Sequence, residues 1–237
     1  TGFDIRDLEK ILISIRDTAC TADVKIITGD TKVAEKGAVD KIFINTSGVG
    51  EYRWDYNQDF SKIEEGDSVV INGDIADHGT AVMVARGDFK IKADIFSDVA
   101  PLNKMIEAVL NRGFEIKFIR DCTRGGLAAT LNEIARGSGH GIRILEDNIP
   151  VKKEVKAVCD ILGLEPLYVA NEGKAVFVIK NKAKELVGFL KKFSEGKNAV
   201  IIGNVEKIKG NRVILETSLG AERIIDMPSG ENLPRIC

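Results

Sequence analysis

The chain has 237 residues, enough to bury a substantial core in one large domain, or in one domain and part of another. Its 34 lysines and arginines nearly balance 36 aspartates and glutamates, and this formal charge of -2 argues against a nucleic-acid surface or an anionic membrane as the main partner. No apolar run has the length of a bilayer span, and no basic-then-apolar secretory pattern opens the sequence. We therefore expect a cytoplasmic protein. Four dispersed cysteines indicate neither a disulfide framework nor a zinc cluster.

The first predicted element is an amphipathic helix that begins almost at once. Asp4 is placed as its N-cap, and apolar residues follow at helical spacing up to Ala19. An apolar helical stripe needs a surface to cover, and the natural candidates would precede residue 1. We interpret the sequence as a chain that lacks its N-terminal part.

Two short strands are predicted next, in VKIITGDTKV (24–33) and DKIFINTSGVG (40–50), and they would belong to the remnant of one domain. The polar stretch 56–68 is the best boundary in the sequence. The predicted organisation is therefore a partial N-terminal ATP-binding domain over 1–54, an α/β domain over 55–226, and a mobile tail over 227–237.

Strands and helices alternate in the second domain, which is typical of an α/β or α+β fold with helices covering a sheet. A helix over 124–136 is expected to be capped by Thr123 and ended by Gly137. The predicted strands are 68–74, 115–121, 141–147, 175–181 and 199–205, with a terminal hairpin over 211–228; the other helices are 76–85, 101–111, 153–162 and 183–193.

Two motifs follow predicted strands in the first half of the chain. In TGDTKV, Asp30 could bind Mg²⁺ through one oxygen and Lys32 could contact a phosphate, although a polar turn explains the same residues. NGDIADHG places Asp74, Asp77 and His78 just past a strand end, where α/β ligand sites form, but His78 could equally be an ordinary helix-start residue.

RDCTRGG (120–126) closes another predicted strand and opens a helix. Its glycines could present backbone N–H groups to an anion at the helix N-terminus. The alternative is a tight crossover in which the glycines relieve crowding and Arg120 forms a surface ion pair. Further along, NEGK (171–174) puts Glu172 in a loop beside a strand, where it is either a general base or a solubilising carboxylate.

The cysteines divide into two groups. Cys159 shares an apolar helical stripe and is predicted to lie in the core, and Cys20 receives no functional role. Cys237 is the last residue, beyond Pro228, Gly230 and Pro234, where the chain is not expected to pack. A thiol in that position is either incidental or a carrier.

The order of these motifs strongly resembles the HypE family of hydrogenase maturation factors. The resemblance covers the whole chain through TGDTKV, SGVG, GDIADHG, APLN, RDCTRGG, LNEIA, NEG and the terminal PRIC, the last being the most specific. The family lies in the superfamily of aminoimidazole ribonucleotide synthetase and selenophosphate synthetase, ATP-dependent enzymes of two α/β domains. Cys122 stands where the family usually has proline, and the family's N-terminal acidic motifs for Mg²⁺ and ATP are absent.

This resemblance implies ATP-dependent dehydration of a thiocarboxamide to a thiocyanate, the source of the cyanide ligands of [NiFe]-hydrogenase. It implies that Cys237 carries the group, that Lys32 and Glu172 contact the thiocarboxamide nitrogen, and that Gly29, Asp30 and Thr31 bind ATP, with Asp30 also a ligand of Mg²⁺. The implied partners are the carbamoyltransferase HypF, the iron-carrying HypC–HypD complex and a second copy of the chain. Because acidic motifs are missing, we expect this chain by itself to be inactive. Another synthetase of the superfamily, or a non-catalytic docking module for maturation proteins, are the competing interpretations.

Overall fold

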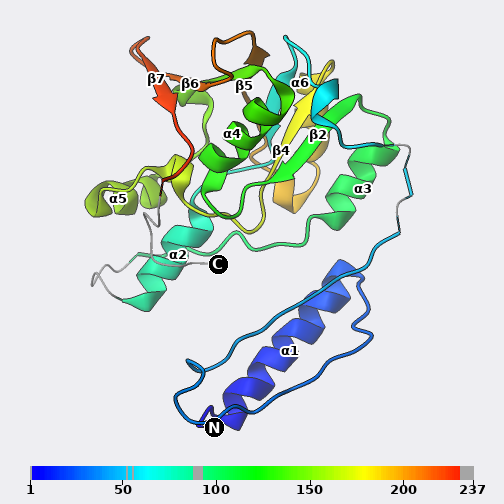
Figure 1. Cartoon of the computed structure of the whole chain (residues 1–237), viewed down its shortest axis with the longest axis vertical. Coiled ribbons are helices and arrows are strands. Elements are labelled where there is room, and N and C mark those ends of the chain that lie inside the picture. The colour runs from blue at the N-terminus through cyan, green and yellow to red at the C-terminus, as the bar shows by residue number, and fades with distance from the viewer. Residues whose placement is uncertain (1, 52, 55, 88–92, 230–237) are drawn as a thin grey trace. The chain divides into compact units, whose positions relative to one another are not determined.

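The computed structural model describes residues 2–51, 53–54, 56–87 and 93–229, and the chain divides into two compact units, Thr1–Asp55 and Tyr56–Cys237 (Figure 1). Among the described residues, no helix combines the length and the apolar composition that crossing a bilayer requires. The roles that the sequence suggests for the two units stay predictions.

The first unit contains the predicted helix, α1 (Ile5–Ala22), and Asp4 is its N-cap because the Asp4 carboxylate accepts a hydrogen bond from Arg6 N at 2.8 Å. None of the residues of α1 is buried. The two predicted strands are wrong, since residues 24–50 contain no strand. Their β-branched composition favours extended backbone, but a strand is completed only by a hydrogen-bonded neighbour, and no ladder forms within this segment.

The second unit is built on one seven-stranded sheet with the order β2-β4-β1-β5-β3-β6-β7. β3 and β6 run parallel, whereas the other neighbouring pairs are antiparallel. The five predicted strands and the terminal hairpin are confirmed. The strands are β1 (Ser68–Ile71), β2 (Ile116–Asp121), β3 (Gly141–Leu145), β4 (Ala175–Ile179), β5 (Val200–Glu206), β6 (Val213–Glu216) and β7 (Glu222–Ile225).

Helices and short 3₁₀ turns connect these strands, and the predicted α/β (α+β) class is confirmed. The helices are α2 (Asp77–Arg86), α3 (Asn103–Asn111), α4 (Gly126–Ser138), α5 (Lys153–Leu162) and α6 (Ala183–Leu190), and the 3₁₀ turns are η1 (Phe60–Lys62), η2 (Glu146–Asn148), η3 (Pro166–Tyr168) and η4 (Ser194–Gly196).

The ends of α4 differ from the prediction. Gly125 occupies the N-cap position in the left-handed region (φ 75°), and Thr123 instead donates its hydroxyl to Asp121 Oδ2 at 2.9 Å. The helix continues through Gly137 and stops at Gly139, also left-handed. Gly137 is required for packing, because a Cβ there would lie 2.6 Å from the Phe60 ring.

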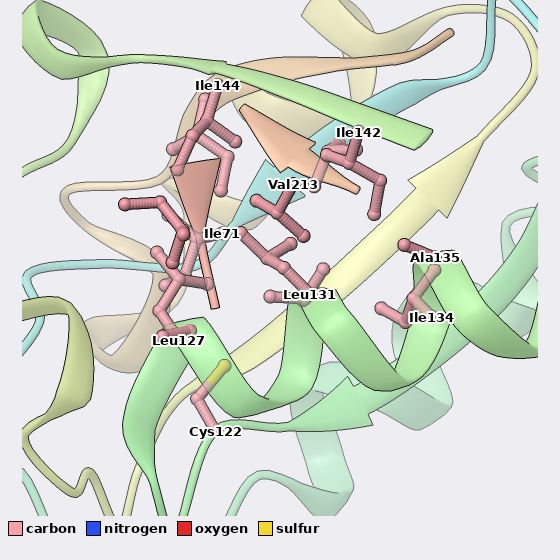
Figure 2. Close-up of a cluster of buried hydrophobic side chains, with 14 of the residues drawn as sticks. Ile71, Cys122, Leu127, Leu131, Ile134, Ala135, Ile142, Ile144 and Val213 are labelled. Atoms are coloured by element: carbon pink, nitrogen blue, oxygen red, sulfur yellow. The ribbon is translucent and has the colours of Figure 1, made fainter. Parts of the chain in front are cut away.

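The core lies on both faces of the sheet, which explains why β4 is buried along its whole length. Alternate side chains of β4 point to opposite faces. Val176 and Val178 join the cluster under α4, whereas Phe177 and Ile179 join the cluster under α3 and α6. Figure 2 shows the first cluster, with α4 side chains directed at residues of β1, β3 and β6. Each large side chain buried in this way contributes about 1.5–3 kcal/mol, so the sheet gives the loops at its end a rigid base.

Candidate active site

The loops that carry three of the motifs meet at one end of the sheet. β4 lies between β1 and β2 and is antiparallel to both. Ile71, the last residue of β1, faces Val176, and Asp121, the last residue of β2, faces Ala175. The loops that follow β1 and β2 therefore lie beside the loop that precedes β4. NGDIADHG, RDCTRGG and NEGK are brought together in this way, although about fifty residues separate each from the next along the sequence.

Asn171 connects the three loops through its side chain. Its Oδ1 accepts a hydrogen bond from Ala76 N at 2.7 Å, and its Nδ2 donates to the carbonyl oxygens of Cys122 at 2.9 Å and Val169 at 3.2 Å. The residue is completely buried. A buried amide that uses both ends in this manner fixes the backbone around it.

Asn72, at the end of β1, makes a second connection. Its Nδ2 donates to the carbonyl oxygens of Gly173 at 3.1 Å and Glu195 at 2.7 Å, and its Oδ1 accepts from Ala175 N at 2.8 Å. The backbone on both sides of Lys174 is therefore attached to the β1 loop.

Glu172 is the exception in this hydrogen-bonded loop. Its backbone N–H donates to Asp98 Oδ1 at 3.1 Å, but the structure gives its carboxylate no hydrogen bond and no ion pair with any described residue. The residue is half-buried. An anchored backbone with an unused carboxylate is compatible with a group that acts on a ligand, and the role of Glu172 stays a prediction.

The polar side chains of the β1 loop have protein partners. Asp77 is buried and forms an ion pair with Lys152, and burial raises the pKa of its carboxyl above the usual value. Asp74 accepts a hydrogen bond from Asn198 Nδ2 at 2.6 Å, and His78 Nδ1 lies 2.8 Å from Ser97 Oγ. His78 is the second residue of α2, the helix-start position that the sequence suggests, and its role as a ligand stays a prediction.

In the β2 loop the glycines relieve crowding. Gly126 has a φ of 61°, and a Cβ there would lie 2.5 Å from the carbonyl oxygen of Val169. Arg120 forms an ion pair with Glu133 at 2.9 Å. Both features agree with the interpretation of RDCTRGG as a tight crossover, and the anion-binding alternative stays a prediction.

The inner cysteines belong to the core, as the sequence predicts for Cys159. Cys122 and Cys159 are fully buried. Burial raises the pKa of the Cys122 thiol to about 12, so it is not a nucleophile at neutral pH.

The residues of TGDTKV lie in the first unit, on exposed non-helical backbone. Asp30 Oδ1 accepts a hydrogen bond from Thr31 N at 2.8 Å, which leaves Oδ2 available. The Lys32 ammonium has no partner among the described residues, and Gly29 is exposed. In this part of the chain and in the other described ranges, no three His, Cys, Asp or Glu side chains form a metal-binding group.

The predicted site residues are thus distributed over three regions. Asp30 and Lys32 lie in one unit and Glu172 in the other. Cys237 falls in 230–237, outside the described residues. Asp226, the residue before the predicted tail, is attached to the second unit, because Tyr168 Oη donates to its carbonyl oxygen at 3.1 Å.

Sequence reasoning missed Asp98 and Lys152, the partners that hold site residues from other loops. A lysine at the head of a fully apolar strand, as Lys174 is, signals that a carboxylate must be near, but the sequence does not say which one.

Comparison with known proteins identifies the relatives of the chain. The family model "AIR synthase related protein, C-terminal domain" matches residues 64–216. The carbamoyl dehydratase HypE of Azotobacter vinelandii is 42% identical over 237 residues, which is all of this chain and 70% of that protein. The crystal structure of a HypE–HypF complex matches 96% of this chain and 74% of that chain, with 46% identity and a TM-score of 0.91. A crystal structure of HypE in complex with ATP matches all of this chain and 72% of that one, with 39% identity and a TM-score of 0.94.

Proposed function

Because the chain belongs to the HypE family of carbamoyl dehydratases, which act in hydrogenase maturation, we propose that it uses ATP to dehydrate an S-carboxamide on Cys237 to an S-cyanate. The cyanide is then donated to the iron centre of a [NiFe]-hydrogenase. Membership of this family favours the dehydratase over another synthetase of the superfamily, since similarity extends over the whole chain rather than over the shared C-terminal domain alone.

The reaction removes one water from the carboxamide. The amide oxygen is a poor leaving group, and ATP, when bound, supplies the phosphoryl group that lets this oxygen depart as phosphate. The protein must then accept the protons of the amide nitrogen while the carbon–nitrogen triple bond forms, and it must keep water away from the activated carbon. ATP and the carboxamide become ADP, phosphate and the S-cyanate.

The unpartnered carboxylate of Glu172 is the observation that carries this proposal. A general base must be ionised and free to accept a proton, and it must be held within hydrogen-bond reach of the group that loses it. Glu172 has a free carboxylate on a fixed backbone. Lys32, exposed and unpaired among the described residues, would contact the same nitrogen and balance negative charge near it.

The TGDTKV segment fits the part of ATP binding proposed for it. Mg²⁺ bound with nucleotide usually takes only one or two protein carboxylates, because phosphates and waters fill its other positions. Asp30 offers one available oxygen, so it would hold Mg²⁺, with Gly29 and Thr31 beside the nucleotide. The chemistry supplied by the ion is neutralisation of phosphate charge.

The partners follow from the chemistry of the carried group. HypF would place the carbamoyl group on Cys237, and the HypC–HypD complex would receive cyanide on its iron. The chain would work in the cytoplasm as a homodimer. A thiol at the end of a tail suits this series of transfers, because it must reach one site, leave it and reach another.

Intact-mass spectrometry tests the proposal directly. The full-length protein, carbamoylated by HypF, should lose the mass of one water when ATP and Mg²⁺ are added, and Cys237→Ala should accept no carbamoyl group. Residues appended after Cys237 should block transfer and leave ATP binding unchanged. Dehydration by the alanine variant would contradict the carrier role. A protein that binds HypF but never consumes ATP would support the docking-module alternative.

A further inference from the structure

Asp98, in the loop between α2 and α3, holds the backbone of the Glu172 loop. Its Oδ1 accepts a hydrogen bond from Glu172 N at 3.1 Å, and its Oδ2 accepts from Gly173 N at 3.3 Å. The side chain is only 3% exposed. One buried carboxylate therefore receives two consecutive backbone N–H groups, the first from the proposed base itself.

Lys174 completes this arrangement from the other side. Its ammonium lies 3.0 Å from Asp98 Oδ2 with 9% of the side chain exposed, and it donates to the carbonyl oxygen of Gly173 at 3.3 Å. A buried ion pair gives little net stability, because desolvating both charges offsets most of their attraction. What the pair does provide is one defined conformation of the peptide between Glu172 and Lys174.

Close backbone contact fixes the same loop against Asp98. A Cβ on Gly173 would lie 2.0 Å from the carbonyl oxygen of Asp98, so only glycine allows the two segments to approach this closely. The loop is thus held by the Asp98 backbone as well as by its carboxylate.

We propose that Asp98 is the positioning residue for Glu172 in the dehydration step. Asp98 is not itself a base for the substrate, because both of its oxygens are occupied by protein donors in a water-poor site. It acts through the Glu172 backbone, which it keeps in the place where the free carboxylate meets the amide nitrogen. A catalytic group displaced by about 1 Å loses roughly 100-fold in rate, which makes this support necessary. The inference rests on the proposed role of Glu172 as base.

The test compares Asp98→Asn, Glu172→Gln and the double variant in the full-length, carbamoylated protein. The amide introduced by Asp98→Asn would keep one acceptor oxygen but would turn its NH₂ donor toward Gly173 N or Lys174. We expect kcat for thiocyanate formation to fall on the order of 100-fold while KM for ATP stays unchanged. The double variant should be no slower than Glu172→Gln alone, because both changes disable the same group. Asp160→Asn, at an exposed position on α5, is the matched control.

The outcomes separate this inference from the proposed function. Wild-type turnover by Glu172→Gln would refute the base and with it the positioning role. A reduced kcat in Glu172→Gln together with a wild-type kcat in Asp98→Asn would refute the positioning role and leave the base in place. A further drop in the double variant would also refute it, since Asp98 would then act independently of Glu172.

A second variant and a second measurement keep the inference testable if Asp98→Asn does not fold. Asp98→Asn combined with Lys174→Met removes the unpaired buried cation and should restore folding but not turnover. Hydrogen exchange should be faster at the amides of Glu172 and Gly173 and unchanged within β4. Full turnover by the folded Asp98→Asn, Lys174→Met protein, or unaltered exchange at these two amides, would overturn the positioning role.

Discussion

Replacing Asn171 with alanine tests whether one buried amide holds the three site loops together. The variant leaves Ala76 N without its acceptor at a completely buried position. Ala76 also has a φ of 72°, in the left-handed region that alanine rarely adopts, so its hydrogen bond stabilises a strained residue.

The expected loss follows from the three hydrogen bonds of the Asn171 side chain. An orphaned buried N–H costs about 1–3 kcal/mol, and each lost donated bond costs about 0.5–1.5 kcal/mol. The loss at the carbonyl oxygen of Cys122 costs less than that at Val169, because the Cys122 oxygen still accepts a hydrogen bond from the backbone N–H of residue 171 at 3.2 Å. We expect the free energy of unfolding to fall by about 3 kcal/mol, a large share of the roughly 5–15 kcal/mol typical of a domain.

Urea denaturation followed by circular dichroism measures this change, with the slope of the transition compared between variants. Asn181→Ala is the matched control, because Asn181 is exposed and makes one long hydrogen bond, to Glu115 at 3.4 Å. The control should stay within about 0.5 kcal/mol of the wild type. An Asn171→Ala protein within about 1 kcal/mol of the wild type, at unchanged slope, would refute the view that this amide joins the loops.

Three further predictions concern other buried groups. Iodoacetamide should label exposed Cys20 in the native protein and leave buried Cys122 unlabelled. Because burial raises the Cys122 pKa from 9.0 to about 12, the native state retains the thiol proton between these values while the unfolded state loses it, and the free energy of unfolding should fall as pH rises through this range. Burial likewise raises the pKa of Asp77, so the native state retains the carboxyl proton at higher pH than the unfolded state does. The free energy of unfolding therefore falls as pH rises above about 3.8, and Asp77→Asn should remove this contribution to the fall. An identical pH dependence of the urea midpoint in the wild type and the variant would contradict this. Gly173→Ala should lower the thermal midpoint, because the added Cβ would overlap a backbone oxygen. The control Gly188→Ala, inside α6 with no atom within 4 Å of the added Cβ, should raise the free energy of unfolding by up to about 1 kcal/mol. Equal midpoints for the two variants would show that the loop around Gly173 can move to accommodate the Cβ.

Local patterns were sufficient to predict most of the second unit. AVFVI reads as a buried strand because it is apolar on both faces, and the helix predicted over 153–162 has these same bounds in α5. Prediction fails where distant residues decide the local structure. Thr123 has the chemistry of an N-cap, yet the close approach of Val169 to Gly126 places glycines at the start of α4 instead.

In the candidate site, too, local motifs could be predicted from the sequence and distant partners could not. Glu172 could be singled out because a motif carries it, but Asp98 lies 74 residues away in the sequence and no periodicity connects the two. In the first unit, short apolar runs predicted strands over 24–33 and 40–50, but no hydrogen-bonded neighbour completes them within that segment. A sequence pattern describes what a segment can pair with, and only the tertiary structure supplies the partner.

The strand order also has a consequence for the synthesis of the protein. β1 pairs with β4 and β5, and β2 pairs with β4, so neither of these early strands neighbours the other or β3 in the described sheet. A growing chain must reach Ile179 before its first strand finds a neighbour. Until then β1, β2 and β3 have open edges, the condition in which nascent polypeptides aggregate or bind chaperones. Because the same late strand follows directly from the Glu172 loop, translation of about eight consecutive codons supplies both this loop and the strand that joins β1 to β2, whereas β3 finds its neighbour only when β5 is made.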